Sequence, residues 1–199
     1  MDQGAAQGFA LPPKFGAWFA KRGWAPRAHQ LKLAELGLAG KSALLIAPTG
    51  GGKTLAGFLA SLVQLDARGT PKPGRPRPLH TLYISPLKAL AVDIARNLEA
   101  PIAEMGLPIT LETRTGDTPA GKRVRQKHSP PDIMLTTPEQ IALLIASRDA
   151  AHFFRGLKFV IIDELHAMSG NKRGHLLSLG LARLRALAPG LTAIGLSAT

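Results

Sequence analysis

The residues best suited to chemistry lie in a glycine-rich segment, Ala47-Pro48-Thr49-Gly50-Gly51-Gly52-Lys53-Thr54. An apolar run precedes it and a helical pattern follows it, which is the context that a phosphate-binding loop needs. Consecutive glycines let backbone N–H groups turn toward phosphate oxygens, and the N-terminus of the following helix adds its positive dipole. We expect Lys53 to place its charge on the β- and γ-phosphates and the Thr54 hydroxyl to bind Mg²⁺. The segment starts with alanine where the general pattern has glycine, and an ordinary surface turn is the alternative.

Two adjacent carboxylates follow a second apolar run, Val160-Ile161-Ile162-Asp163-Glu164. Many strands end in an acid, so this pair indicates a nucleotide site only together with the glycine-rich loop. In that combination we expect Asp163 to hold Mg²⁺ through water, and Glu164 to orient and deprotonate an attacking water molecule. His166 follows, but none of the six histidines has a metal-binding spacing, so no zinc site is expected.

Six short apolar runs alternate with helical patterns, which predicts an α/β fold with a mostly parallel sheet sandwiched by helices. The expected strands are 42–47, 80–85, 109–113, 132–136, 159–163 and 192–197, and most are apolar on both faces, as buried parallel strands are. Helices are expected at 14–22 and 27–38, along an apolar face from Leu87 to Met105, and after a capping box at 137–140 with proline in the first helical position. The ligands of such a sheet lie at the carboxyl ends of its strands.

Composition narrows the function classes. The 199 residues contain 25 Lys and Arg against 13 Asp and Glu, a net charge of +12 that favours a polyanionic partner. There is no cysteine, which excludes disulfides, thiolate catalysis and cysteine-built metal sites and suits a cytoplasmic protein. The apolar runs are too short to span a membrane, and the N-terminus has no secretory pattern, so no membrane partner is expected. Cations are dense in a proline-rich stretch at 68–78, predicted to be a surface loop, and in a run at 122–127.

The motifs as a set resemble superfamily 2 helicases of the DExH type. The glycine-rich loop is similar to their motif I, Asp163-Glu164-Leu165-His166 to motif II, and Ser197-Ala198-Thr199 to motif III. Gln30, in Pro26-Arg27-Ala28-His29-Gln30, is similar to the glutamine that reads adenine. Three further segments are similar to motif Ia and to the two motifs that grip a nucleic-acid strand: Ser85-Pro86-Leu87-Lys88-Ala89-Leu90, Arg114-Thr115-Gly116-Asp117 and Thr136-Thr137-Pro138-Glu139. The resemblance runs from Pro13 to Thr199. Within the superfamily it is to the large helicase-related (Lhr) group, with the bacterial ligase-associated DExH helicases as the nearest likeness.

This resemblance implies a P-loop NTPase of the RecA-like type at 26–199, after a helical lead-in at 1–25. ATP and Mg²⁺ would be held by Arg27, Gln30, residues 49–54 and Asp163, with Lys53, Asp163, Glu164 and His166 as the catalytic set. One strand of DNA, or of RNA, would contact Pro86, Lys88, Arg114, Thr115, Gly116 and residues 136–139, with the cations of 122–127 flanking it. His166, Ser197, Ala198 and Thr199 would couple the nucleotide state to the nucleic acid.

The family resemblance also implies a second RecA-like domain in cis, carrying an arginine finger, which the 199 residues do not include. The isolated chain is therefore expected to be nearly inactive as an ATPase. It further implies a 3′-to-5′ DNA translocase in DNA repair, with partners such as a ligase. The phosphate loop and the acidic pair by themselves also allow a non-helicase P-loop ATPase or kinase. A nucleic-acid-binding module without turnover is a further alternative, and no residue decides between DNA and RNA.

Overall fold

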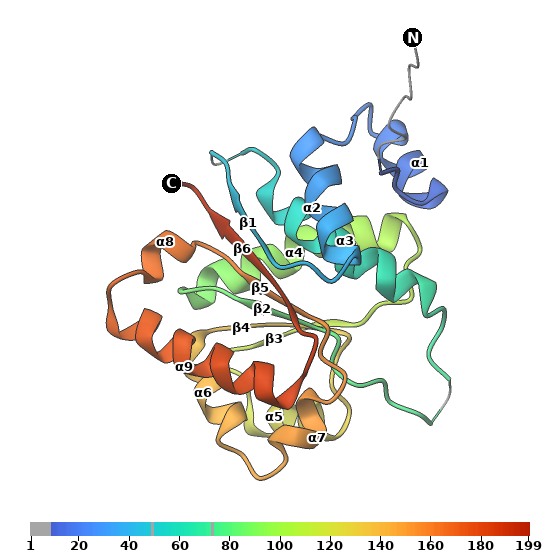
Figure 1. Ribbon diagram of the computed structural model, residues 1–199. Coiled ribbons are helices and arrows are strands. Elements are labelled where there is room, and N and C mark those ends of the chain that lie inside the picture. Colours follow the sequence, from blue (N-terminus) through green and yellow to red (C-terminus); the bar gives the residue numbers. More distant parts are fainter. Residues whose placement is uncertain (1–8, 49, 73) are drawn as a thin grey trace.

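The computed structural model describes residues 9–48, 50–72 and 74–199, so Thr49 of the glycine-rich loop lies outside the described residues. Six strands form one parallel sheet in the order β1-β6-β5-β2-β4-β3, which runs through the middle of the molecule (Figure 1). They are β1 (Ala43–Ile46), β2 (Thr81–Ile84), β3 (Leu111–Arg114), β4 (Ile133–Thr136), β5 (Phe159–Ile162) and β6 (Thr192–Ser197). The six expected strands are confirmed, each to within two residues at either end.

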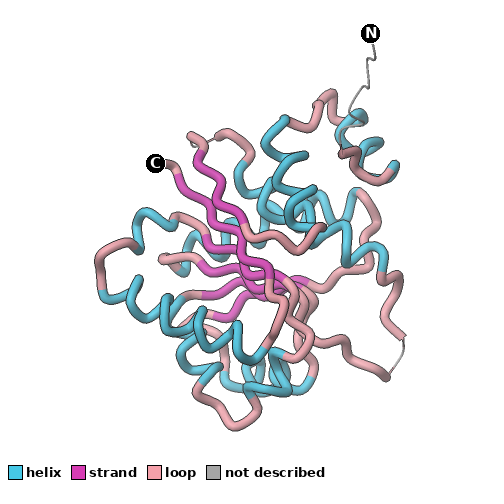
Figure 2. The backbone as a smooth tube through the Cα atoms, viewed as in Figure 1, coloured by secondary structure: helices cyan, strands magenta, loops and turns pink. Residues whose placement is uncertain are grey.

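Helices cover both faces of the sheet (Figure 2). They are α1 (Pro13–Lys21), α2 (Ala28–Leu38), α3 (Lys53–Ala67), α4 (Lys88–Glu104), α5 (Ala120–His128), α6 (Pro138–Ile145), α7 (Ala150–Phe154), α8 (Leu165–Met168) and α9 (Lys172–Leu187). Helices α1 to α4 share one hydrophobic core with one side of the strands, and α6, α7 and α9 share a second core with the other side. The predicted sheet sandwiched by helices is therefore confirmed.

The strands serve both cores because successive side chains point to opposite faces. Tyr83 and Ile161 belong to the α1–α4 core, whereas Leu82 and Val160 belong to the core on the other side. This two-sided burial explains why the strands read as continuous apolar runs. The lead-in helix α1 packs on the same core through Phe15 and its neighbours Trp18 and Phe19.

The capping box expected at 137–140 is wrong in its hydrogen bonds. Thr137 is the N-cap of α6 and Pro138 occupies its first turn, as predicted, but the Thr137 side chain makes no capping hydrogen bond. The Gln140 N–H, which a capping box would satisfy, donates instead to the Thr137 carbonyl oxygen at 3.1 Å. The first turn thus closes through the backbone, and because Pro138 has no N–H, the Glu139 N–H is the one of this turn left without a backbone partner.

The strand order places the motifs in two groups along one edge of the sheet. All strands are parallel, so their carboxyl ends lie at the same edge, where the motifs begin. β1, β6 and β5 lead into the glycine-rich loop, motif III and the acidic pair, whereas β2, β4 and β3 lead into the three strand-gripping segments. The two groups meet where β5 pairs with β2. No helix in the described ranges is both long and apolar enough to cross a membrane.

Candidate nucleotide site and nucleic-acid track

The glycine-rich loop joins β1 to α3. Gly50 and Gly52 have φ angles of 78° and 73°, in the left-handed region that favours glycine. A Cβ atom on Gly52 would lie only 2.7 Å from Gln30 Nε2, so a side chain there would push the Gln30 amide away from the loop. Gly52 is also the N-cap of α3, which directs the N-terminus of this 15-residue helix at the loop. The loop therefore has the backbone geometry of an anion site.

Lys53 lies at the start of α3 with only 8% of its surface exposed. Its Nζ donates to the Ala47 carbonyl oxygen at 2.6 Å, across the mouth of the loop. Ala47 in turn donates its N–H to the Ser197 carbonyl oxygen at 3.1 Å, which ties the loop to the end of β6. An ammonium group has three N–H donors, so two remain for the oxygens of a bound phosphate. The expected contact of Lys53 with phosphate stays a prediction that this geometry permits.

Asp163 and Glu164 follow β5 at the same edge. Asp163 is 5% exposed, and its two carboxylate oxygens accept hydrogen bonds from the Tyr83 hydroxyl at 2.7 Å and from the Glu164 N–H at 2.8 Å. Burial, together with the adjacent Asp163 charge, raises the pKa of Tyr83 far above its usual range, so the phenol stays a neutral donor. Asp163 is thus a buried carboxylate held by neutral donors, with no ion pair among the described side chains.

These residues fit Mg²⁺. The cation prefers oxygen ligands, keeps several waters, and is bound by one or two carboxylates plus substrate phosphates. Asp163 offers an oriented carboxylate, and Thr54 in the first turn of α3 offers a hydroxyl. No cluster of three or more His, Cys, Asp or Glu side chains occurs in the described part of the chain, which agrees with a metal that takes its remaining ligands from nucleotide and water.

Motif II and motif III are joined through His166. Its Nε2 lies 3.2 Å from Glu164 Oε2, and its Nδ1 lies 3.1 Å from Ser197 Oγ. The Ala198 N–H also donates to Nδ1, at 3.4 Å, so Nδ1 is an acceptor and the ring proton of the neutral form lies on Nε2, toward Glu164. The single hydroxyl hydrogen of Ser197 has two acceptors within reach, His166 Nδ1 and the Thr199 carbonyl oxygen, which lies 2.5 Å from Oγ. The four residues expected to couple nucleotide to nucleic acid are therefore brought together.

Glu164 has an unusual backbone. Its φ of 50° is the only positive φ at a non-glycine residue in the described ranges, and Glu164 is the N-cap of α8. Left-handed backbone costs free energy for a residue with a side chain and concentrates at functional sites. No residue pattern predicted this conformation, in which Glu164 Oε2 lies beside His166 Nε2.

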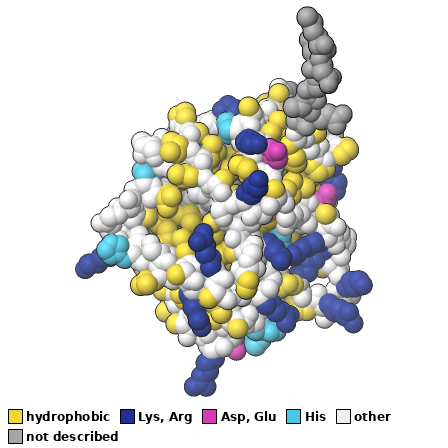
Figure 3. All heavy atoms as spheres, in the orientation of Figure 1, with side chains coloured by type: hydrophobic (Ala, Val, Ile, Leu, Met, Phe, Trp, Pro, Cys, Tyr) yellow, Lys and Arg dark blue, Asp and Glu magenta, His cyan; other side chains and the backbone are white. Residues whose placement is uncertain are grey.

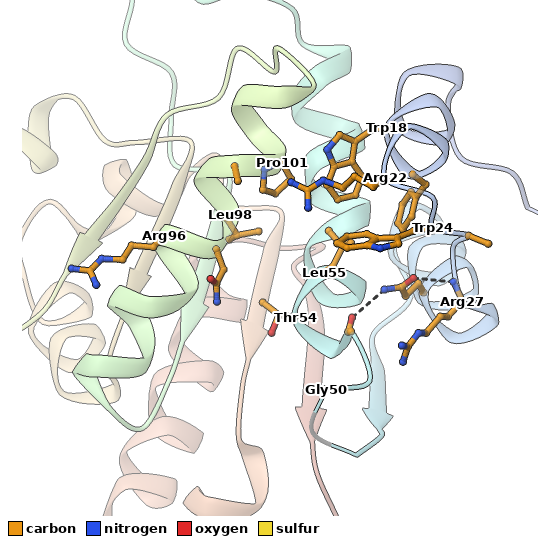
Figure 4. A pocket seen from close by; sticks show the side chains of 16 residues that line it. Trp18, Arg22, Trp24, Arg27, Gly50, Thr54, Leu55, Arg96, Leu98 and Pro101 are labelled. Atoms are coloured by element: carbon orange, nitrogen blue, oxygen red, sulfur yellow. Dashed lines mark hydrogen bonds between the residues drawn. The ribbon is translucent and has the colours of Figure 1, made fainter.

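A hollow of about 690 Å³ opens beside the phosphate loop (Figure 4). Its wall includes Gln30, Gly52, Thr54 and Trp24. Gln30 Oε1 accepts from the Arg27 N–H at 2.9 Å, and Gln30 Nε2 donates to the Gly52 carbonyl oxygen at 3.3 Å. One N–H and one lone pair of the Gln30 amide remain, which is the donor–acceptor pair that the edge of adenine needs.

Aromatic side chains shape the outer part of this hollow. Trp24 is 52% exposed and packs edge-to-face on Trp18, with ring centroids 6.0 Å apart. The Arg22 guanidinium lies 5.0 Å from both indole centroids and bonds Glu104 of α4. Figure 4 shows Arg22 and Trp24 beside each other at the mouth, with Arg27 below them and Gly50 at the base. Arg96 and Asn97 of α4 add polar groups to the opposite wall.

The strand-gripping segments begin at the carboxyl ends of β2, β4 and β3. Helices α4 and α6 start there with N-caps Leu87 and Thr137, and neither has a side-chain cap. The first turn of α4 therefore keeps open N–H groups. In α6, Pro138 has no N–H and the Gln140 N–H bonds the Thr137 carbonyl oxygen, which leaves the Glu139 N–H. Lys88 Nζ bonds Asp117 Oδ2 at 2.7 Å, a largely exposed pair that links motif Ia to the turn after β3. Gly116 and Glu139 are exposed at the same edge. Pro86, Thr115, Thr137 and Pro138 are buried at this edge, so their expected contacts with a strand stay predictions.

Two expected contacts with nucleic acid need correction. The Arg114 side chain is 5% exposed and donates to the Arg123 carbonyl oxygen at 3.1 Å, while the fully buried Thr136 hydroxyl donates to the Arg114 carbonyl oxygen at 2.7 Å. Both side chains point into the protein because they join β3, β4 and α5. They position the turn after β3, and neither presents a polar group to a strand of nucleic acid.

Three of the cations of 122–127 are bound to neighbouring groups of the protein, and the expected position of this run beside the track stays a prediction. Lys122 and Arg125 pair with Glu112 of β3, at 3.9 and 2.7 Å. Arg123 donates to the carbonyl oxygens of Thr118 and Gly116, which holds the turn after β3. The high density of cations in this part of the sequence therefore reflects ion pairs and hydrogen bonds with β3 and the turn that follows it.

Sequence reasoning missed Tyr83 and Arg123. Tyr83 is the single tyrosine of the chain and reads as one more apolar strand residue. Only the pairing of β2 with β5 brings its hydroxyl to Asp163. Arg123 is hidden in a basic run, and no sequence signal separates it from the cations beside it.

Comparison with known proteins decides the family. Residues 27–199 match the model described as DEAD/DEAH box helicase. The chain belongs to this helicase family. The helicase domain is 42% identical over 196 residues to the Lhr helicase/uracil glycosylase of Escherichia coli strain K12, an alignment that covers 92% of the chain and 13% of that protein. The chain thus spans only a small part of the curated relatives it matches.

Solved structures agree with this assignment. The helicase domain superposes with a TM-score of 0.84 and 39% identity on Mycobacterium smegmatis helicase Lhr bound to ssDNA and AMP-PNP, covering 95% of the chain and 25% of that one. It superposes with a TM-score of 0.80 and 28% identity on the DUF1998 helicase MrfA bound to DNA and AMPPNP, covering 95% of the chain and 26% of that one. The predicted RecA-like fold and the resemblance to the Lhr group are confirmed. The nearer likeness to ligase-associated helicases stays a prediction.

Proposed function

We propose that this helicase domain is the first motor domain of an Lhr-type, ATP-dependent DNA helicase. It binds Mg²⁺–ATP at the glycine-rich loop and one strand of DNA across the carboxyl ends of β2, β4 and β3. The proposal rests on the place where the nucleotide site and the DNA track meet at the edge of the sheet. There Tyr83, on the strand that leads into motif Ia, bonds Asp163 of motif II at 2.7 Å.

The nucleotide half uses groups already in place. Lys53 exchanges the Ala47 carbonyl oxygen for phosphate oxygens, and the loop N–H groups hold the same phosphates. Thr54 and Asp163 hold Mg²⁺, which when bound neutralises charge that develops on the transferred phosphoryl group. Glu164 orients a water molecule and takes its proton once its carboxylate turns from His166.

The base of ATP occupies the hollow of about 690 Å³. The free N–H and lone pair of the Gln30 amide pair with the edge of adenine, and Trp24 offers an exposed aromatic surface at the mouth. Arg27, whose side chain lines the same hollow near Gly50 (Figure 4), adds positive charge beside the phosphates.

The DNA half contacts phosphates. First-turn N–H groups of α4, the Glu139 N–H of α6, the exposed Gly116 backbone and Lys88 offer donors at one edge, and such contacts fix a strand without reading its sequence. The structures of Lhr bound to ssDNA and AMP-PNP and of MrfA bound to DNA and AMPPNP support this assignment. We further propose a cytoplasmic role in DNA repair, with a second RecA-like domain in cis and partners such as a ligase.

His166 transmits the change at the nucleotide. When Glu164 releases Nε2, the ring keeps its hydrogen-bond contacts to Ser197 and Ala198 at the end of β6. A shift of the ring therefore moves motif III, the part of the cleft expected to face the second domain.

ATP hydrolysis by residues 1–199, compared with a chain extended through the second domain, tests the proposal. We expect the short chain to bind Mg²⁺–ATP but to hydrolyse it at least about 10³-fold more slowly, because an arginine finger contributes roughly 10³–10⁵ in rate. Single-stranded DNA should stimulate only the longer chain, and an RNA strand of equal length should stimulate it less. Equal, DNA-stimulated rates in both chains would contradict the two-domain motor.

A further inference from the structure

A second basic surface lies at the opposite edge of the sheet. Because β5, β2 and β4 are neighbours and parallel, the segments that lead into them converge at the amino-terminal edge, away from the nucleotide and the track. These segments are the loop residues 68–72 and 74–80, the end of α5 with the residues that follow it to 132, and α7 with the residues that follow it to 158. We call this surface the basal patch. Its carboxylate is Asp132, and its basic members are Arg68, Lys72, Arg75, Arg77, Lys127, His128, His152, Arg155 and Lys158.

Cations in the basal patch far outnumber carboxylates. Asp132 pairs with Arg77 at 3.4 Å, but both oxygens of that carboxylate are buried, and one already accepts two bonds from Thr110. Arg75 and Arg155 are exposed and make no ion pair among the described residues. Figure 3 shows Lys and Arg side chains gathered along the right and lower sides of the molecule, where Figure 1 places α7 and the loop from α3 to β2.

The positive charges of the basal patch also affect a buried histidine. The pKa of the buried His80, at the start of β2, falls to about 3 because of its burial and because the charges of Arg68 and Lys158 lie close to it. Those two residues come from different segments of the chain, so their charges add at one place.

A small hollow of about 50 Å³ lies within the basal patch. Its lining includes the side chains of Arg77, Lys127, His128, His152 and Arg155 and contains no carboxylate. Pro76, Pro78 and Pro130 form the rest of the wall together with Phe153, so the donors at this place are cationic or imidazole side chains. The hollow admits one group of phosphate size, while the surrounding cations extend beyond it on all three segments.

We propose that the basal patch binds the phosphodiester backbone of a second stretch of DNA, on the face opposite the motor track. Cations spread over three segments suit a chain of phosphates better than a single small anion. A lipid surface fits poorly, because the strongly exposed large apolar side chains of the described residues lie outside these segments. DNA held here would keep the motor domain near its substrate while the track releases and rebinds the strand.

Amide chemical shifts of the 199-residue chain test the proposal directly. A 12-nucleotide oligo-dT probe at low salt should shift two groups of amides, those of the track at 87–90, 115–118 and 137–140 and those of the basal patch. The triple variant Arg75→Glu, Lys127→Glu and Arg155→Glu should lose the basal shifts and keep those of the track. A matched variant, Lys21→Glu, Lys41→Glu and Arg183→Glu, replaces three exposed cations elsewhere, has the same net charge, and should keep both groups.

Binding of a 40-nucleotide strand gives the second readout. Loss of three phosphate contacts should reduce the slope of log affinity against log salt by about 2 in the basal triple variant, and by much less in the matched variant. Shifts at the track alone, equal losses in both triple variants, or equal basal shifts with inorganic phosphate or poly-glutamate at the same charge concentration would each overturn the proposal. Track shifts and nucleotide binding report on the motor separately, so failure of the basal patch leaves that function standing.

Discussion

The Tyr83 hydroxyl is the group whose removal tests the nucleotide site most sharply. Tyr83→Phe deletes the 2.7 Å bond to Asp163 and keeps the ring, which stacks on Phe58 with centroids 5.5 Å apart. Asp163 then retains only the Glu164 N–H as a donor, so its carboxylate is free to turn. We expect two effects, one on stability and one on the affinity for Mg²⁺–ATP.

The magnitudes follow from burial. A hydrogen bond to a charged acceptor contributes about 1.5–3 kcal/mol, and this one is shielded from water, so the free energy of unfolding should fall by about 2 kcal/mol without ligand. A group that orients a metal ligand typically changes metal affinity by about 10–100-fold. We therefore expect the Mg²⁺ concentration that half-saturates nucleotide binding to rise at least about tenfold.

Titration of a fluorescent ATP analogue against Mg²⁺, and again in EDTA, measures this. The variant should differ from wild type with Mg²⁺ and match it in EDTA. Phe58→Leu is the matched control, because it disturbs the same stack without touching Asp163 and should change stability alone. An unchanged or lower Mg²⁺ requirement in Tyr83→Phe would refute the orienting role, since it would mean that the phenol competes with the cation for the carboxylate.

Four further outcomes are expected. Lys53→Ala should abolish tight ATP binding, because it removes the cation that lies across the loop mouth; wild-type affinity in a nucleotide titration would contradict the site. Gln30→Ala should weaken ATP more than GTP, because it removes the pairing for adenine, and equal losses for both would leave Gln30 as a support of the loop. Glu164→Gln, in a chain with both motor domains, should bind ATP but not hydrolyse it, and turnover at the wild-type rate would place the base elsewhere. The pKa of His80 is about 3 in the folded chain, below its ordinary 6.5. The unfolded chain therefore binds more protons below pH 6.5, and the free energy of unfolding falls as the pH drops toward 3. Urea unfolding at pH 7 and 4.5 should show a loss of about 3 kcal/mol from this group, and the loss should be correspondingly smaller in His80→Gln.

Predictions from local pattern held where the physical cause is local. The apolar runs marked the strands because both faces of each are buried, and the glycines marked the loop because only glycine accepts left-handed backbone without strain. The capping box failed for a related reason. The residue types were predicted correctly, but the Gln140 N–H donates to the Thr137 carbonyl oxygen and not to the Thr137 hydroxyl.

Side-chain roles that depend on a neighbour from elsewhere in the chain escaped the sequence. Arg114 looked like a cation for phosphate, yet its guanidinium bonds the Arg123 carbonyl oxygen, because α5 packs back on β3. Lys127 sits in the same basic run as Arg123, but it lines the hollow of the basal patch at the other edge. The sequence cannot distinguish a basic residue that binds the protein backbone from one that lines a surface hollow, because the difference depends on how the helix packs.

Residue types at short spacing were enough to predict the helices and strands, the glycine-rich loop, the acidic pair and the family. The pairing of β1 with β6 and of β5 with β2 became visible only in the folded chain. That order joins Tyr83 to Asp163 and gathers three basic segments at the far edge. Short-range pattern fixes backbone periodicity and turns, whereas strand order is set by which faces bury each other across the whole chain, and no local spacing carries that information.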